Sequence, residues 1–151
     1  LSSVGNLHPG QPSRYLDWSG PPLAGIICYE ISDGNAVANS VAEGAQWLLA
    51  IANLDPYPIL IQKQFLMLSQ LRSIETARDL ISVANTGPSG LISKSGKVKN
   101  LVPPFVKELQ IVNLNLNNNI TFYTRFKELP LLLFFLYGLF GLIIFRLKFR
   151  T

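Results

Sequence analysis

Three short apolar runs divide the first part of the chain. Leu23–Cys28, Trp47–Asn53 and Leu80–Ala84 are almost entirely apolar, which is typical of strands buried on both faces of a parallel sheet. Asn35–Gln46 and Leu60–Arg78 lie between these runs and are predicted to be helices. The order strand, helix, strand, helix, strand therefore predicts two right-handed crossover units.

The second predicted helix carries its own periodic signal. Ile61, Phe65, Leu68 and Leu71 recur at helical spacing, so we expect them to form one apolar face. This helix is the second crossover helix of the predicted fold.

The pattern changes after the third strand. Gly90–Lys99 is predicted to be a hairpin that turns at Ser95 and Gly96. Leu109–Leu116 alternates apolar and polar residues, which favours an antiparallel or edge strand. Leu1–Pro22, rich in Gly, Pro and Ser, is predicted to be loop.

These elements together predict one domain over residues 1–124, of the α/β class, with a mixed sheet and crossover helices. A longer apolar run follows it. Leu129–Phe145 contains no charged residue and lies between Glu128 and Arg146. At ~1.5 Å per residue such a run spans roughly 25 Å, near the lower limit for a membrane core of ~30 Å.

We therefore predict a transmembrane helix over residues 129–147 and a short basic tail over 148–151; a buried core helix is the alternative. Three basic residues follow the span and two precede it closely, which favours a cytoplasmic C-terminus. The α/β domain would then lie on the outer side of the membrane.

Charge and composition exclude several classes of function. The net charge of +4 comes from the residues around the apolar span, whereas residues 1–124 carry eight basic and eight acidic side chains. We therefore expect no nucleic-acid partner. With one cysteine and one histidine, His8, the chain offers no disulfide or multi-cysteine metal site, and we expect neither metal nor cofactor.

Cys28, at the end of the first predicted strand, has two interpretations. It is either a buried core thiol or a nucleophile at the carboxyl end of a strand, where open α/β sheets bind ligands. No base is evident nearby. Glu30 would raise the pKa of a neighbouring thiol rather than lower it, so the residues alone leave both interpretations open.

A family resemblance favours the interpretation of Cys28 as a nucleophile. ICYEI, GAQWLLAIAN, LRSIETARDLISVANTG, SGLISKSGKV and LVPPF occur in this order before the terminal span. The combination resembles the apolipoprotein N-acyltransferases, the membrane branch of the nitrilase, or carbon-nitrogen hydrolase, superfamily. This resemblance implies a partial nitrilase-like α-β-β-α sandwich, of which only the later elements are present, in a bacterial inner (plasma) membrane with its catalytic domain facing the periplasm.

The resemblance also implies a reaction. Cys28 matches the nucleophile that would form a thioester with an acyl chain from a phospholipid donor, before transfer to the amine of an apolipoprotein acceptor. Glu30 would support the active site, and the backbone N–H of Tyr29 would stabilise the oxyanion. Asn53, Tyr57, Glu75 and Asn85 are further candidates. These four are expected to line or brace the site.

The superfamily's general-base Glu and its oxyanion Lys would come from sequence before the cysteine. The residues that precede Cys28 include neither a Glu nor a Lys. We therefore expect this chain to be a fragment that is inactive alone. The alternatives are an amidase of the same superfamily and a non-catalytic, membrane-tethered remnant.

Overall fold

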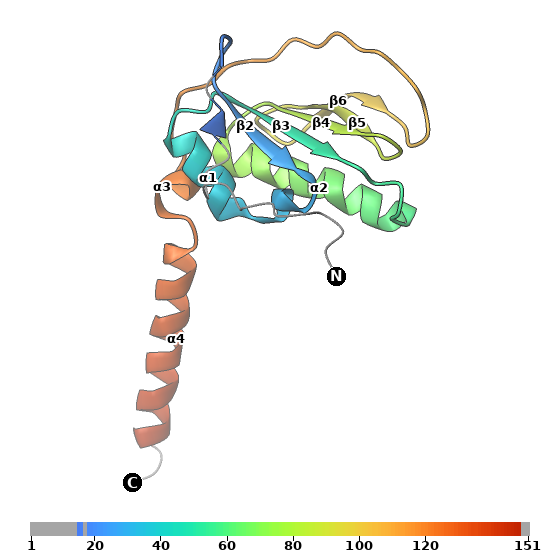
Figure 1. Ribbon diagram of the computed structural model, residues 1–151. Helices are drawn as coiled ribbons and strands as arrows, with labels where there is room; N and C mark the ends of the chain where they lie inside the picture. Colours follow the sequence, from blue (N-terminus) through green and yellow to red (C-terminus); the bar gives the residue numbers. More distant parts are fainter. Residues whose placement is uncertain (1–14, 17, 149–151) are drawn as a thin grey trace, which may run out of the picture.

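The computed structural model describes residues 15–16 and 18–148 (Figure 1). The described residues form one sheet whose strands follow chain order: β1 (Tyr15–Leu16), β2 (Leu23–Ile27), β3 (Trp47–Ala52), β4 (Leu80–Ala84), β5 (Ser89–Ile92) and β6 (Val98–Val102). The helical elements are η1, a 3₁₀ turn (Cys28–Ser32), α1 (Gly34–Ala42), α2 (Ile59–Thr76), α3 (Phe122–Phe126) and α4 (Leu129–Lys148).

The sheet is mixed, as the sequence predicts. β2, β3 and β4 are parallel and are joined by α1 and α2, whereas β1, β5 and β6 pair antiparallel with their neighbours. Each predicted parallel strand lies within one residue of its observed bounds. The α/β class with crossover helices is therefore confirmed.

Several boundaries differ from prediction, and the second predicted helix, Leu60–Arg78, runs from Ile59 to Thr76. The helix expected over Asn35–Gln46 begins at Gly34, after Asp33 accepts a hydrogen bond from the N–H of Ala36 at 3.0 Å, and it ends at Ala42. Gly44 follows with φ of 120°, a conformation that a helix cannot contain. The loop predicted for Leu1–Pro22 contains the short strand β1, because Tyr15 pairs with Ala24; residues 1–14, including His8, lie outside the described part.

The hydrophobic core lies between the sheet and the two crossover helices. Ala24, Leu48, Leu80 and Ile92 are partners across four neighbouring strands, and all four are fully buried. From α2, Phe65, Leu66 and Leu68 pack against this cluster. Leu71, predicted to belong to the same face, is 43% exposed, so that part of the helix prediction is wrong.

The opposite face of the sheet is apolar but largely uncovered. Ile27, Ile51 and Val83 form a row across β2, β3 and β4 and are 63%, 44% and 46% exposed. Residues 106–112 border part of this face along β4 and β5. In the described part of the chain, helices cover only one of the two apolar faces of this mixed sheet, which is the arrangement of half of a layered sandwich.

The strand predicted over Leu109–Leu116 does not form. Leu109 and Ile111 are each 92% exposed, and the segment pairs with no strand among residues 15–16 and 18–148. Its polar positions are anchored instead, because Asn115 donates both its backbone N–H and its side-chain amide to Asp79, at 2.9 and 3.0 Å. These bonds to one carboxylate replace the ladder that a strand would need.

The helix α4 extends away from the domain (Figure 1). The window Leu129–Arg146 is long and apolar enough to cross a membrane, and none of it is buried inside the structure. α4 begins at the predicted Leu129 and ends at Lys148, one residue beyond the predicted bound.

Candidate active site

Cys28 follows β2 directly and adopts a left-handed backbone conformation, with φ of 53°. This conformation is uncommon for residues that carry a Cβ and costs roughly 1–3 kcal/mol. The chain turns sharply there into η1, and the residue is half-buried. A strained turn between a strand and a helix is one way in which α/β enzymes present a nucleophile.

Hydrogen bonds of η1 hold this turn on both sides of Cys28. A carboxylate oxygen of Glu30 accepts the backbone N–H of Ile27 at 2.9 Å. After the cysteine, the Ser32 hydroxyl donates to the carbonyl of Tyr29 at 2.8 Å. The Tyr29 side chain is 73% exposed, so any contribution it makes to chemistry at Cys28 comes from its backbone.

A small cavity lies behind Cys28, at the carboxyl ends of the parallel strands. The lining residues come from η1, β3, β4, α2 and the loops after the strands: Cys28, Ile31, Ala50, Ile51, Ala52, Leu54, Phe65, Leu66, Ser69, Ser82, Val83, Ala84 and Pro88. Its volume of about 10 Å³ is close to that of a single water site. An acyl chain does not fit behind the sulfur in this conformation, and among the described residues the lining includes no Glu or Lys.

The loops after β3 and β4 are joined beside this cavity. The Asn85 amide donates to the Asn53 side-chain oxygen at 2.7 Å, and the Asn85 oxygen accepts the N–H of Leu54 at 2.9 Å. Tyr57 packs its ring against Phe65, with centroids 6.0 Å apart. Asn53, Tyr57 and Asn85 therefore lie at the same sheet edge as Cys28, although none of them lines the cavity.

Glu75 lies elsewhere, near the far end of α2. Its carboxylate is 3.0 Å from the Arg72 guanidinium, and both side chains are largely buried. Burial raises the pKa of Glu75, Arg72 opposes that effect, and Glu128 adds to it. Burial, together with a hydrogen bond to Glu128, likewise raises the pKa of Tyr123 to about 12. This cluster joins α2 to α3 and α4 rather than to Cys28.

The sequence did not single out the polar groups of the cavity, and the helical spacing of Arg72, Glu75 and Arg78 favours a solvated face rather than the buried position that Arg78 has. Ser69 and Ser82 bring hydroxyls into an otherwise apolar lining. Arg78 is buried and donates to the carbonyls of Ala45 and Asn119, each at 2.8 Å. Ser82 interrupts an apolar strand, and this interruption is the one available sequence signal.

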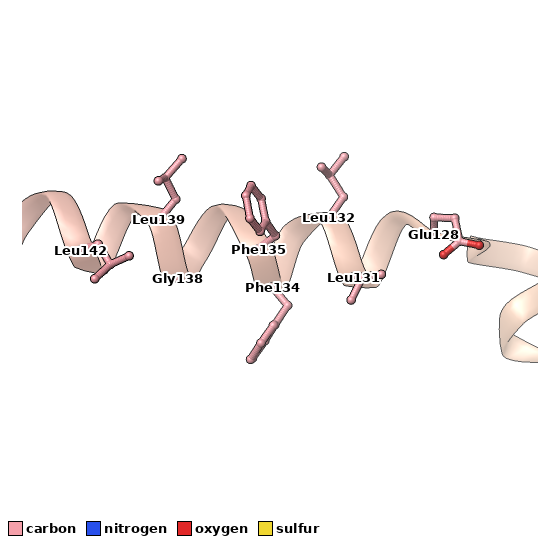
Figure 2. A pocket seen from close by; sticks show the side chains of 8 residues that line it. All are labelled: Glu128, Leu131, Leu132, Phe134, Phe135, Gly138, Leu139 and Leu142. Carbon is pink, nitrogen blue, oxygen red and sulfur yellow. The ribbon is translucent and has the colours of Figure 1, made fainter.

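A much larger hollow, about 910 Å³, runs along α4 and is unrelated to Cys28. Figure 2 shows that its lining side chains come from one helix and from Glu128 just before it. The lining side chains are more than half exposed at Leu131, Leu132, Phe134 and Phe135. None of the apolar window of α4 is buried against the rest of the described structure. The hollow is an apolar helix surface, and Glu128 is the one ionisable residue in its described lining.

Solved structures share the fold of the described residues. An amidase from Nesterenkonia sp. matches 73% of this chain and 41% of its own, with a TM-score of 0.53 at 20% identity. A mutant of the amidase from Nesterenkonia AN1, described as a member of the nitrilase superfamily, matches 65% of this chain and 40% of its own with a TM-score of 0.54. This chain therefore has the fold of part of these amidases. No family model matches the sequence.

Sequence relatives identify the family. The chain is 53% identical over 148 residues to an apolipoprotein N-acyltransferase of Prochlorococcus marinus strain MIT 9313, covering 98% of this chain and 30% of that protein. A relative of the same name from Parasynechococcus marenigrum is 53% identical over 83% of this chain and 27% of its own length. The chain belongs to the apolipoprotein N-acyltransferases and spans less than a third of these relatives.

Proposed function

We propose that this chain supplies the nucleophile of an apolipoprotein N-acyltransferase. The observation that carries the proposal is Cys28, in a strained turn at the carboxyl end of β2, within a sequence that matches N-acyltransferases over 98% of its length. Glu30 supports the turn through the N–H of Ile27. The substrates are a phospholipid acyl donor and the N-terminal amine of a diacylglyceryl-cysteine apolipoprotein.

In the first half-reaction the Cys28 thiolate attacks the ester carbonyl of the phospholipid. The tetrahedral intermediate collapses, the carbonyl carbon–oxygen ester bond breaks, and the lysophospholipid leaves after its alkoxide takes a proton. A thioester remains on Cys28. We assign the stabilisation of the oxyanion to the backbone N–H of Tyr29, because Tyr29 directly follows the nucleophile in η1.

In the second half-reaction the amine of the apolipoprotein attacks the thioester carbonyl. The carbon–sulfur bond breaks, an amide forms, and the amine proton passes to a base. The described lining of the Cys28 cavity contains neither a Glu nor a Lys. We therefore assign the general base and the oxyanion lysine to parts of the protein beyond these residues, so this chain alone is inactive.

The location follows from the substrates and the span. α4 anchors the domain in the bacterial inner membrane, and the basic residues at its C-terminal end, Arg146 and Lys148, together with Arg150 after it, favour a cytoplasmic C-terminus. The Cys28 domain then faces the periplasm. Protease digestion of intact spheroplasts tests this orientation, because a periplasmic domain is cleaved without lysis and a cytoplasmic one is protected.

Intact-mass spectrometry of the full-length protein tests the reaction. Incubation with a phospholipid of defined acyl chains should add the mass of one acyl group, and hydroxylamine should remove it. The Cys28→Ala variant should show no adduct. A folded wild-type protein that gains no acyl group would overturn the proposal.

The amidase alternative rests on the fold neighbours, which are amidases. Release of ammonia from small aliphatic amides, without acyl transfer to an amine, would favour that function. Absence of both reactions in the full-length protein would favour the non-catalytic, membrane-tethered remnant.

A further inference from the structure

The outward side of α2 carries an apolar stripe. Leu60, Met67, Leu71 and Ile74 are 66%, 64%, 43% and 54% exposed. At 3.6 residues per turn these four positions fall within roughly 60° of one another around the helix axis. The opposite side faces the sheet and includes four buried polar residues: Gln62, Ser69, Ser73 and Thr76. The usual amphipathic arrangement is therefore absent from the outer surface of this helix.

Charge is sparse on the same surface. Seven residues of α2 are exposed: Ile59, Leu60, Lys63, Gln64, Met67, Leu71 and Ile74. Five of these seven are apolar, and Lys63 is the only charged one. The other charged residues of α2, Arg72 and Glu75, are largely buried and pair with each other. Contiguous exposed apolar side chains of this kind mark an interaction surface.

The position of α4 indicates what this surface contacts. Figure 1 shows α4 leaving the domain on the side of the sheet that α1 and α2 cover, and running across the direction of α2. The two helices are also linked, because Thr121 donates to the carbonyl of Glu75 and Tyr123 donates to Glu128 at 3.0 Å. When α4 spans a membrane, α2 lies close to the membrane plane with its apolar stripe facing the lipid.

Basic side chains lie at both ends of the stripe. Lys63 is near the Leu60 end. At the other end Gln70 donates to the carbonyl of Gly96 at 2.8 Å, which holds the β5–β6 turn with its exposed Lys94 and Lys97 beside Ile74. Apolar residues flanked by lysines suit the boundary between acyl chains and anionic headgroups.

We propose that α2 is an interfacial membrane-binding helix. Leu60, Met67, Leu71 and Ile74 enter the boundary between the headgroups and the acyl chains, and Lys63 extends to the lipid phosphates. The occupant is the lipid bilayer, because the Ile74 end of the stripe adjoins Glu75, which binds the segment that leads into the membrane span, and because the stripe offers few polar groups with which a protein partner could form hydrogen bonds. This proposal holds whatever reaction Cys28 performs.

Depth-dependent quenching tests the proposal in the full-length protein. In a Cys28→Ala background, Met67→Cys and the control Lys99→Cys, on β6, are labelled with an environment-sensitive fluorophore. The protein is reconstituted in liposomes of phosphatidylethanolamine and phosphatidylglycerol, with or without brominated acyl chains. The Met67 probe should shift to shorter wavelength and lose most of its emission with brominated lipid, whereas the Lys99 probe should change little.

Two results would overturn the proposal. A Met67 probe that is quenched by aqueous iodide as strongly as the Lys99 probe would mean that the stripe is free in solution. A probe that is blue-shifted but insensitive to brominated lipid would mean that protein, from the same chain or a second copy, covers the stripe. Leu71→Cys provides a second position, and its quenching should follow that of Met67 if folding is intact.

Discussion

At the scale of single residues, the backbone of Cys28 and the carboxylate of Glu30 define the candidate site together. The left-handed conformation of Cys28 stores strain, and the bond from Ile27 to Glu30 stabilises the turn that contains it. The sequence shows that these residues are neighbours. It does not show that Glu30 binds the backbone before the cysteine, because that requires the reversal of the chain at η1.

We expect Glu30→Ala to slow thioester formation by about two- to tenfold, since the hydrogen bond that it removes beside Cys28 is solvent-exposed and contributes roughly 0.5–1.5 kcal/mol. Glu30→Gln keeps an oxygen that can accept the bond from Ile27 and should retain more activity than the alanine variant. Burst-phase acylation, followed by intact mass, measures both. Equal loss in the two variants would show that the negative charge, not the hydrogen bond, is required.

Glu75 leads to a prediction about pH. Because burial raises its pKa, the folded state binds the proton more tightly than the unfolded state does. The stability from this preference is complete below the ordinary pKa of 4.5 and is lost as the pH rises through the raised value. The unfolding free energy of wild type should therefore fall with rising pH relative to that of Glu75→Gln.

Thermal unfolding at a series of pH values, in detergent, measures this difference. Glu108→Gln, at an exposed glutamate, is the matched control and should give a curve parallel to that of wild type. A Glu75→Gln curve that is also parallel to that of wild type would contradict the assignment of this pH dependence to the raised pKa of Glu75.

At the scale of elements, the helices meet at a polar junction. A Cβ at Gly34 would lie 1.7 Å from an Arg72 nitrogen and 2.6 Å from the Tyr123 hydroxyl. The start of α1 is therefore packed directly against α2 and α3. A side chain at this point must displace Arg72 from its ion pair with Glu75.

We expect Gly34→Ala to lower the free energy of unfolding by about 1–3 kcal/mol, because the junction has no room for a methyl group. Gly138→Ala is the comparison, since a Cβ there meets no atom within 4 Å. Denaturant unfolding monitored by tryptophan fluorescence measures both. An unchanged midpoint for Gly34→Ala would mean that Arg72 repositions without cost.

Elements also show where a local pattern is sufficient. The sequences of β2, β3 and β4 are apolar on both faces, so they are expected to form buried strands in almost any layered fold. Leu109–Leu116 has equally clear alternation but no partner strand within reach, and Asp79 holds its polar side instead. Periodicity reports a preference for extended backbone, whereas strand formation depends on a neighbour far away in sequence.

At the scale of the whole molecule, the uncovered apolar face of the sheet is the main indication that this domain is half of a sandwich. Ile51 lies at its centre and is 44% exposed. In a complete nitrilase-like sandwich a second sheet would bury it. The chain's match to less than a third of its relatives is consistent with that arrangement.

We expect Ile51→Asn to destabilise the full-length protein by about 2–5 kcal/mol, because it would bury an amide between two sheets. Leu109→Asn, at a position 92% exposed, should change stability by less than about 0.5 kcal/mol. Unfolding of the two variants in parallel checks this. Equal effects would show that the face is open to solvent in the intact protein.

The sequence by itself determined the parallel strands, the helices between them, the terminal apolar helix and the candidacy of Cys28. These features depend on local periodicity and on short motifs, which can be recognised without knowing which elements pack against one another. Only the tertiary structure decided the backbone of Cys28, the position of Glu75 beside α4, and the outward direction of the apolar stripe on α2. The reason is physical: which face of an element is buried depends on what packs against it, and those contacts join residues far apart in the chain.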